Sequence, residues 1–72
     1  MNKVKNVPYY TDGRKYEPID VILDWDLNFN LGNVVKYVSR AGRKDVDATE
    51  DLMKAKQYIE YEIELLARRT ND

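Results

Sequence analysis

The sequence predicts an all-α fold, a small three-helix domain with an extended N-terminal arm. Apolar residues recur three and four positions apart along three segments, and no segment alternates polar and apolar residues long enough to form a strand. With 72 residues there is room for one domain. A chain of this size buries only about 60% of the surface that it exposes when unfolded. We therefore expect a small core and assembly as a homo-oligomer.

Residues 1–16 form the predicted arm, and residues 17–72 form the predicted helical domain. The arm is polar, carries several tyrosines and contains the turn signal Thr11-Asp12-Gly13. Tyr9 and Tyr10 are candidates for stacking on a nucleotide base, because aromatic rings bind the face of any base. Tyrosines more often edge a small core or fill an interface, so this alternative remains open.

Two short helices are predicted after the arm. Proline suits the first turn of a helix, where its missing N–H has no partner, so the first helix is expected from Pro18 to Trp25. The second is expected from Leu31 to Ala41, after a capping connection that contains Asn28 and Asn30. Gly42 follows where a left-handed C-cap residue is expected. The apolar side chains of the second helix share one arc and form its predicted core face: Leu31, Val34, Val35, Val38 and Ala41.

The third helix is the longest and is expected from Ala48 to Arg68. Its predicted core stripe is Ala48, Leu52, Ala55, Ile59, Ile63 and Leu66. Met53 and Tyr61 lie on the face opposite this stripe. Apolar side chains there suggest a partner helix from another chain, which is the basis for a third hypothesis, a protein-interaction module.

The composition excludes several classes of chemistry. The chain has no Cys and no His, which excludes disulfides, ordinary zinc sites and Ser-His or Cys-His nucleophile pairs. No apolar run approaches the roughly 20 residues that span a bilayer, and the N-terminus lacks a signal-peptide core. We expect a cytoplasmic protein without a membrane partner. The net charge of -1 gives no long-range attraction to polyanions, so phosphate binding requires local clustering of cations.

Such a cluster is present on the second helix. Polar and basic residues recur there at spacings of three, four, three and one, so they fall within about 100° on the side opposite the apolar arc. Arginine can grip a phosphate with two hydrogen bonds, and lysine adds a point charge. A nearby tyrosine could contact a base or sugar. The alternative is a solvated face whose cations stabilise the helix dipole. The predicted ligand-binding residues are Asn33, Lys36, Tyr37, Arg40, Arg43 and Lys44.

A second candidate site consists of carboxylates on the first helix. Mg²⁺ prefers one or two carboxylates together with the phosphates of a substrate. Glu17 and Asp20, with Asp24 nearby, could therefore hold Mg²⁺ beside a nucleotide. The alternative is an ordinary polar helix face. Ligand binding alone requires no cofactor.

Three stretches of the chain resemble the SaV-like family of small phage and prophage proteins, which is of unknown function and often labelled "nucleotide kinase". The stretches are Glu17–Asp20, Asn28–Lys44 and Glu50–Ile59, and the resemblance covers roughly residues 8 to 66. We call the polar and basic residues that share one side of the second helix the basic stripe: Asn33, Lys36, Arg40, Arg43 and Lys44. The run G-N-x-x-K-Y-x-x-R-A-G-R-K contains all of them. Relatives commonly carry a His-Tyr pair in the arm, where this chain has Tyr9-Tyr10.

The resemblance implies a phage protein in the cytoplasm of an infected bacterium. Together with the basic stripe, it favours binding of a nucleotide or nucleotide-derived signalling molecule, which the protein would sequester against host defence. The first alternative is a nucleoside monophosphate kinase without a P-loop, with Mg²⁺ as its cofactor. Because the histidine is missing, binding is favoured over catalysis. Nucleic acid is not expected as a partner, because the rest of the chain is acidic and would repel a long polyanion.

Overall fold

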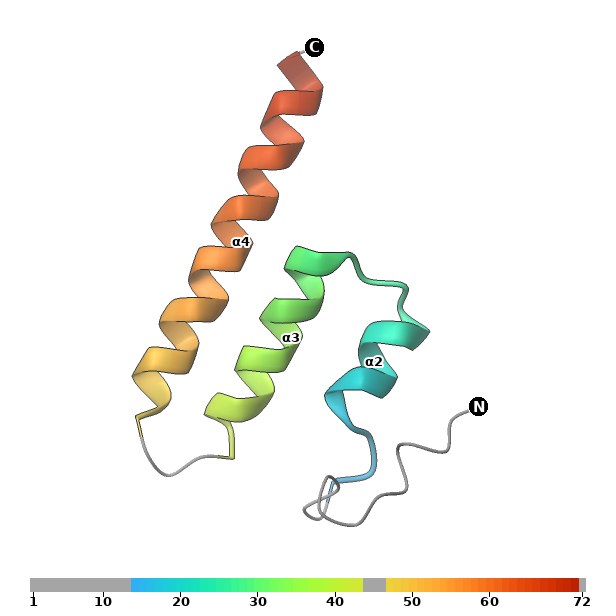
Figure 1. The fold of residues 1–72 in the computed structure, drawn as a ribbon, viewed down its shortest axis with the longest axis vertical. Helices are drawn as coiled ribbons and strands as arrows, with labels where there is room; N and C mark the ends of the chain where they lie inside the picture. The colour runs from blue at the N-terminus through green and yellow to red at the C-terminus, as the bar shows by residue number, and fades with distance from the viewer. Residues whose placement is uncertain (1–13, 44–46, 72) are drawn as a thin grey trace.

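The computed structural model describes residues 14–43 and 47–71, which form three helices joined by short links (Figure 1). Helix α2 spans Pro18–Asp24, α3 spans Phe29–Ala41 and α4 spans Ala48–Asn71. No strand occurs within these two ranges, so the predicted all-α class is confirmed for them. Most of the predicted arm, including Tyr9 and Tyr10, lies outside the described residues.

The helix starts follow from their capping residues. Asp20 Oδ2 accepts a 2.9 Å hydrogen bond from the backbone N–H of Glu17, just before Pro18 opens α2. Asn28 Oδ1 accepts a 2.9 Å bond from the N–H of Leu31. Because Asn28 is the cap, α3 begins two residues earlier than the sequence predicted.

The left-handed conformation predicted for Gly42 is wrong. Gly42 has a φ of -77° and remains right-handed. Its N–H donates to the carbonyl of Val38, and the N–H of Arg43 donates to the carbonyl of Arg40, so helical turns continue past the end of α3. Among the described non-glycine residues, Asp26 has a positive φ, 55°, in the link between α2 and α3.

The three helices lie side by side in a single layer. α3 is in the middle, and the chain runs up α2, down α3 and up α4 (Figure 1). The shortest extent of the Cα trace is 12 Å, less than the roughly 13–15 Å that the Cα atoms of two stacked layers of helices would span. Among residues 14–43 and 47–71, α2 and α4 lie along the two edges of α3 and leave both of its broad faces open.

Close contacts fix the edges of this layer. On the α2 side, a Cβ atom on Gly32 would lie 3.3 Å from Ile22 Cγ2, so the glycine allows the two helices to approach closely. On the α4 side, Asn28 and Asn30 each donate a 3.0 Å hydrogen bond to the carboxylate of Glu62. These bonds attach the start of α3 to the middle of α4.

The predicted core stripe of α4 is largely wrong. Ala55 is 4% exposed and is the buried apolar side chain of the described residues. The four large residues of the stripe are instead 43–60% exposed: Leu52, Ile59, Ile63 and Leu66. The residues that contact α3 lie about a quarter turn away, because Tyr58 and Glu62 make the ring and hydrogen-bond contacts that orient α4.

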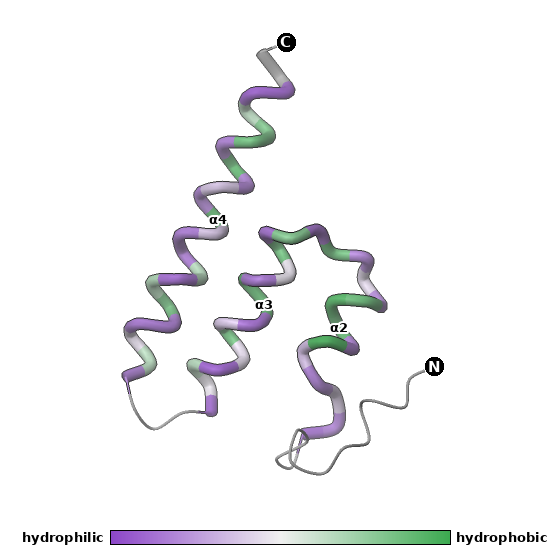
Figure 2. The backbone as a smooth tube through the Cα atoms, viewed as in Figure 1, coloured by the Kyte–Doolittle hydropathy of each residue, from purple (hydrophilic) through white to green (hydrophobic). Residues whose placement is uncertain are grey.

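The apolar face predicted for α3 is also only partly covered. Leu31 and Val38 are exposed, and the remaining three predicted positions are half-buried. Figure 2 shows hydrophobic positions alternating with hydrophilic ones along the helices, including the part of α4 that extends beyond α3. A single layer leaves these side chains without a second layer to cover them.

Helix α4 is amphipathic and carries charges at both ends. Glu50 and Asp51 lie in its first turn and Arg68 and Arg69 in its last turn, which favours the helix dipole at each end. No helix in residues 14–43 and 47–71 is both long and apolar enough to cross a membrane.

Candidate functional site

The basic stripe of α3 lies on one open face of the layer. Gly32 and Ser39 lie on the edge toward α2 and the residues before it, and Asn30 and Tyr37 lie on the edge toward α4. Since successive residues turn by about 100°, these contacts fix the other two sides of the helix. One side holds the apolar residues. The other presents Phe29, Asn33, Lys36, Arg40 and Arg43.

Three cations surround the ring of Tyr37. Lys36 Nζ lies 5.0 Å from the ring centroid, Arg40 Cζ lies 5.8 Å from it and Lys54 Nζ lies 5.5 Å from it. Two of these cations come from α3 and one comes from α4. We call the side of the layer that carries Lys36, Arg40 and Lys54 the cationic face.

A row of aromatic rings borders the cationic face. Tyr37 stacks on Tyr58 with 6.0 Å between ring centroids and 11° between ring planes. Tyr58 in turn meets Phe29 and Tyr61 edge to face, at 5.8 Å and 5.7 Å. Phe29 and Tyr61 are exposed, so the row offers aromatic surface to a ligand next to the cations.

One cation of the face is held by a buried carboxylate. Arg40 Nε lies 3.6 Å from Asp51 Oδ1, and the two side chains are 49% and 2% exposed. The buried Asp51 carboxylate therefore orients the Arg40 side chain and offsets part of its charge. Half of the arginine surface stays accessible from the cationic face.

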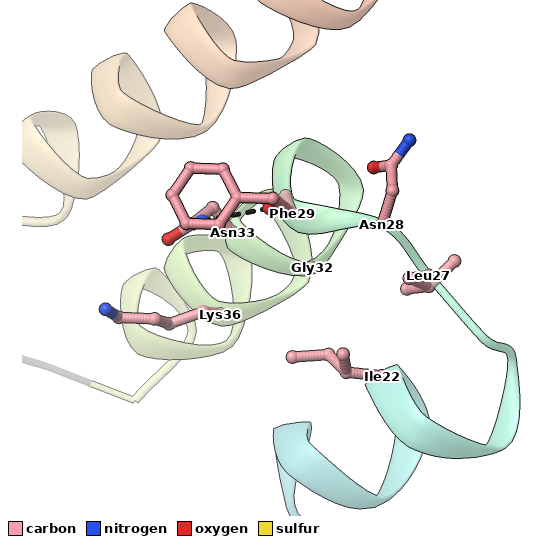
Figure 3. A pocket seen from close by; sticks show the side chains of 7 residues that line it. All are labelled: Ile22, Leu27, Asn28, Phe29, Gly32, Asn33 and Lys36. Carbon is pink, nitrogen blue, oxygen red and sulfur yellow. Dashed lines mark hydrogen bonds between the residues drawn. The ribbon is translucent and has the colours of Figure 1, made fainter.

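An open hollow of about 230 Å³ lies between α2 and the first half of α3 (Figure 3). Ile22 and Leu27 form an apolar wall on the α2 side. Lys36 lines the hollow and also contacts Tyr37, so it connects the hollow with the three-cation cluster. The hollow is lined by Ile22, Leu27, Asn28, Phe29, Gly32, Asn33 and Lys36.

The other predicted ligand residues have different places. Asn33 Nδ2 donates a 2.9 Å hydrogen bond to the carbonyl of Phe29, so one amide N–H serves the helix. Arg43 lies half-buried in the turn after α3. Lys44, like Tyr9 and Tyr10, lies outside the described residues, and the roles of these three stay predictions.

The predicted metal ligands have structural roles at the start of α2. Asp20 caps the helix through the backbone of Glu17, and the Glu17 side chain is buried. Asp24 is exposed at the end of the helix. In the described parts of the chain, no group of three or more acidic side chains is close enough to hold a metal ion. Mg²⁺ binding by Glu17 and Asp20 remains a prediction.

Two residues of the site, Lys54 and Tyr58, were not predicted as ligand residues from the sequence. Both lie on α4, where their spacing alone gives no reason to single them out. Their contacts with Tyr37 depend on how α3 and α4 pair, which the periodicity of one helix does not reveal. Arg14 was not predicted either: from the segment before α2, its Nη1 donates a 2.9 Å hydrogen bond to Ser39 Oγ of α3.

Glu62 is the described carboxylate whose pKa is clearly shifted. The hydrogen bond from Asn30, then that from Asn28, lowers the pKa of Glu62 below its ordinary value, and the positive charge of Arg69 adds to this effect. The ionised carboxylate thus fixes the end of α3 that carries Phe29.

Comparison with known proteins places the chain in a family. A family model described as "protein of unknown function (DUF3310)" matches residues 4–60, which contain every residue of the cationic face. The comparison with curated proteins and the comparison with solved structures found no match. Because the family model covers most of the sequence, the chain belongs to the DUF3310 family of proteins of unknown function.

Proposed function

We propose that this protein binds a nucleotide or a nucleotide-derived signalling molecule on its cationic face. The observation that carries the proposal is the convergence of Lys36, Arg40 and Lys54 on the ring of Tyr37. Cations held beside an exposed aromatic row suit a ligand that has both a phosphate and a base, because the phosphate neutralises the cations and the base stacks on the rings.

The hollow gives the base a second possible contact surface. Its apolar wall of Ile22 and Leu27 and the exposed ring of Phe29 match the flat, weakly polar face of a base. Lys36 belongs both to this hollow and to the three-cation cluster. A ligand with its base in the hollow would therefore reach the cations with its phosphate.

We further propose that the protein sequesters its ligand rather than converting it. Lysine and arginine side chains supply the neutralising charge, so binding does not depend on Mg²⁺. The resemblance to small phage proteins suggests a biological setting, in which a phage depletes a nucleotide signal of host defence. Depletion requires only a tight complex formed in sufficient amount.

Isothermal titration with a panel of linear and cyclic nucleotides tests the proposal. We expect at least one of them to bind more tightly than millimolar. Lys54→Glu should weaken that binding by about tenfold or more, because it places a negative charge beside the phosphate. Lys56→Glu is the matched control, since it makes the same charge change two residues away on another side of α4. Absence of binding by the folded protein, or equal losses in both variants, would refute the proposal.

An assay of phosphoryl transfer separates sequestration from the kinase alternative. Phosphoryl transfer relies mainly on positioning and charge neutralisation, so a cationic face of this kind is compatible with it in principle. The protein is incubated with ATP, Mg²⁺ and each nucleoside monophosphate. We expect binding without formation of diphosphate. If diphosphate forms in a Mg²⁺-dependent reaction that is lost in Lys54→Glu, the protein is a kinase that acts at the same face, and the sequestration proposal is wrong.

A further inference from the structure

We infer that a second copy of this chain covers the side of the layer opposite the cationic face. This side, the outer apolar face, is formed by Leu31 and Val38 of α3 and by Leu52, Ile59, Ile63 and Leu66 of α4. Two copies would meet through this face whether or not a ligand is bound on the cationic face.

Helix geometry places both sets of residues on the same side of the layer. On α4, Lys54 reaches Tyr37 and therefore lies on the cationic face. At about 100° per residue, Ile59 and Ile63 lie on the opposite side of α4 from Lys54, with the edge toward α3 between them. On α3, Val38 lies opposite the basic stripe in the same way. The apolar residues of the two helices therefore form one continuous face.

The exposure of this face is unusual for a folded domain. The large side chains of the face are 36–60% exposed, whereas Ala55 is the buried apolar side chain of the described residues. Domains are stable as two packed layers around a core, and this chain supplies one layer. A second copy placed face to face supplies the other layer and buries the same side chains from both chains.

The charge pattern favours an identical partner. The part of α3 on this face carries no charged side chain, and on the described part of α4 Lys56 lies at its border. A face without charge offers nothing to an acidic or basic partner, but it is complementary to itself. A twofold axis brings the same patch of both copies together, as in most homodimers.

The size of the face is close to what a small dimer interface needs. From Leu52 to Leu66 α4 rises about 21 Å, and two helices side by side are about 20 Å wide. Taken as flat rectangles, two such faces together cover about 840 Å², near the roughly 1,000 Å² that a specific interface should exceed. α4 has 24 residues and α3 has 13, so α4 extends beyond α3 and can pack against the layer of the partner.

This arrangement has a consequence for the cationic faces. When two layers meet through their outer apolar faces, both cationic faces lie on the outside and point away from each other. Each chain then presents its own Lys36, Arg40 and Lys54 to solvent. The repulsion between the two sets of cations is small at this separation, because salt screens exposed charges beyond about 8–10 Å.

Sedimentation equilibrium of the 72-residue chain and of two lysine variants tests the inference. Ile63 lies on the outer apolar face and Met53 lies outside it, yet their exposed fractions are nearly equal, 60% and 59%. An isolated chain would tolerate lysine equally at both positions. We expect the wild type and Met53→Lys to have the mass of two chains, and Ile63→Lys to weaken the dimer at least tenfold or to abolish it.

If Ile63→Lys fails to fold, thermal melts of the wild type at several protein concentrations still test the inference. Dimers gain stability with protein concentration, so the midpoint of the wild type, followed by circular dichroism, should rise as concentration increases. A wild type with the mass of one chain and a concentration-independent midpoint would overturn the inference. Equal effects of Ile63→Lys and Met53→Lys on the mass would overturn it as well.

Discussion

At the scale of single residues, the site brings three like charges close to one aromatic ring. Lys36, Arg40 and Lys54 repel one another, and this repulsion is offset by the negative face of the Tyr37 ring and, for Arg40, by Asp51. Within the part of the chain that the structure describes, Asp51 is the carboxylate in ion-pair contact with these three cations, so the compensation there is incomplete. A bound phosphate completes it, which gives a physical reason for affinity.

The ring of Tyr37 should contribute to affinity in its own right. Tyr37→Leu keeps an apolar side chain but removes the aromatic surface that the cations and a base would share. We expect ligand binding to weaken by about 1–3 kcal/mol, the usual contribution of one stacking ring. Calorimetry measures the loss, and circular dichroism confirms that the variant is folded. An unchanged affinity would remove Tyr37 from the site.

Glu62 should make the fold less stable in acid. Because the pKa of Glu62 is lowered in the folded state, its carboxylate stabilises the fold above the unfolded pKa of about 4.3. This contribution is lost as the pH falls through the lower folded pKa. We expect Glu62→Gln to lower stability at neutral pH and to flatten the decline below about pH 4.3, as followed by urea denaturation at a series of pH values. The exposed Glu60→Gln is the control and should retain the decline.

At the scale of the helices, hydrophobic periodicity predicted the elements better than their packing. Three helices, the cap at Asn28 and the end of α3 at Ala41 follow from local signals, and the structure confirms them. The apolar stripe of α4 identified an apolar side of the helix but not the side that α3 covers. Of the stripe, Ala55 is buried, and α3 meets α4 through Tyr58, which lies outside the stripe.

The site residues that could be predicted from the sequence are those whose contacts lie within one helix. Lys36, Tyr37 and Arg40 are neighbours on one helix, so helical spacing brings them together. Lys54 joins them only through the pairing of α3 with α4. Gly42 was placed in the left-handed region from its position after the helix, but turn hydrogen bonds from its own N–H keep it right-handed.

Gly32 within α3 and Gly42 directly after it should respond differently to substitution by alanine. At Gly32 the new Cβ would lie 3.3 Å from the stiff, branched Ile22 and push α2 away, whereas at Gly42 it meets the flexible end of Arg14 at 3.3 Å. We expect Gly42→Ala to be neutral or stabilising by up to about 1 kcal/mol. Gly32→Ala should be the less stable variant, with a melting midpoint lower by roughly 4–8 °C. The reverse order would contradict the close packing of α2 on α3.

At the scale of the whole molecule, the layer has two faces of different chemistry. One is cationic and bordered by aromatic rings, and the other is apolar. The net charge of -1 conceals this division, because the acidic residues lie largely elsewhere on the chain. Composition therefore could not reveal it, and the sequence suggested it only through the opposite arcs of α3.

Salt should act on the two faces in opposite directions. Binding on the cationic face depends on charge and should weaken by about tenfold when NaCl rises about tenfold from low ionic strength, because salt screens exposed charges. Association through the outer apolar face should stay constant or tighten, since it depends on burial of apolar surface. Calorimetry and sedimentation in the same buffers measure both. Parallel weakening of ligand binding and self-association would indicate that one face serves both.

The most direct test of the cationic face as a ligand site is a nucleotide titration followed by NMR of the tyrosine rings, with the signals assigned from tyrosine-to-phenylalanine variants. Binding beside Tyr37 should produce saturable shifts of its ring protons and smaller ones at Tyr58, its stacking partner. The signal of Tyr16, which precedes α2 and lies beside Lys15, should change little. Saturable shifts that spare Tyr37, or no shifts with any nucleotide, would contradict ligand binding on the cationic face.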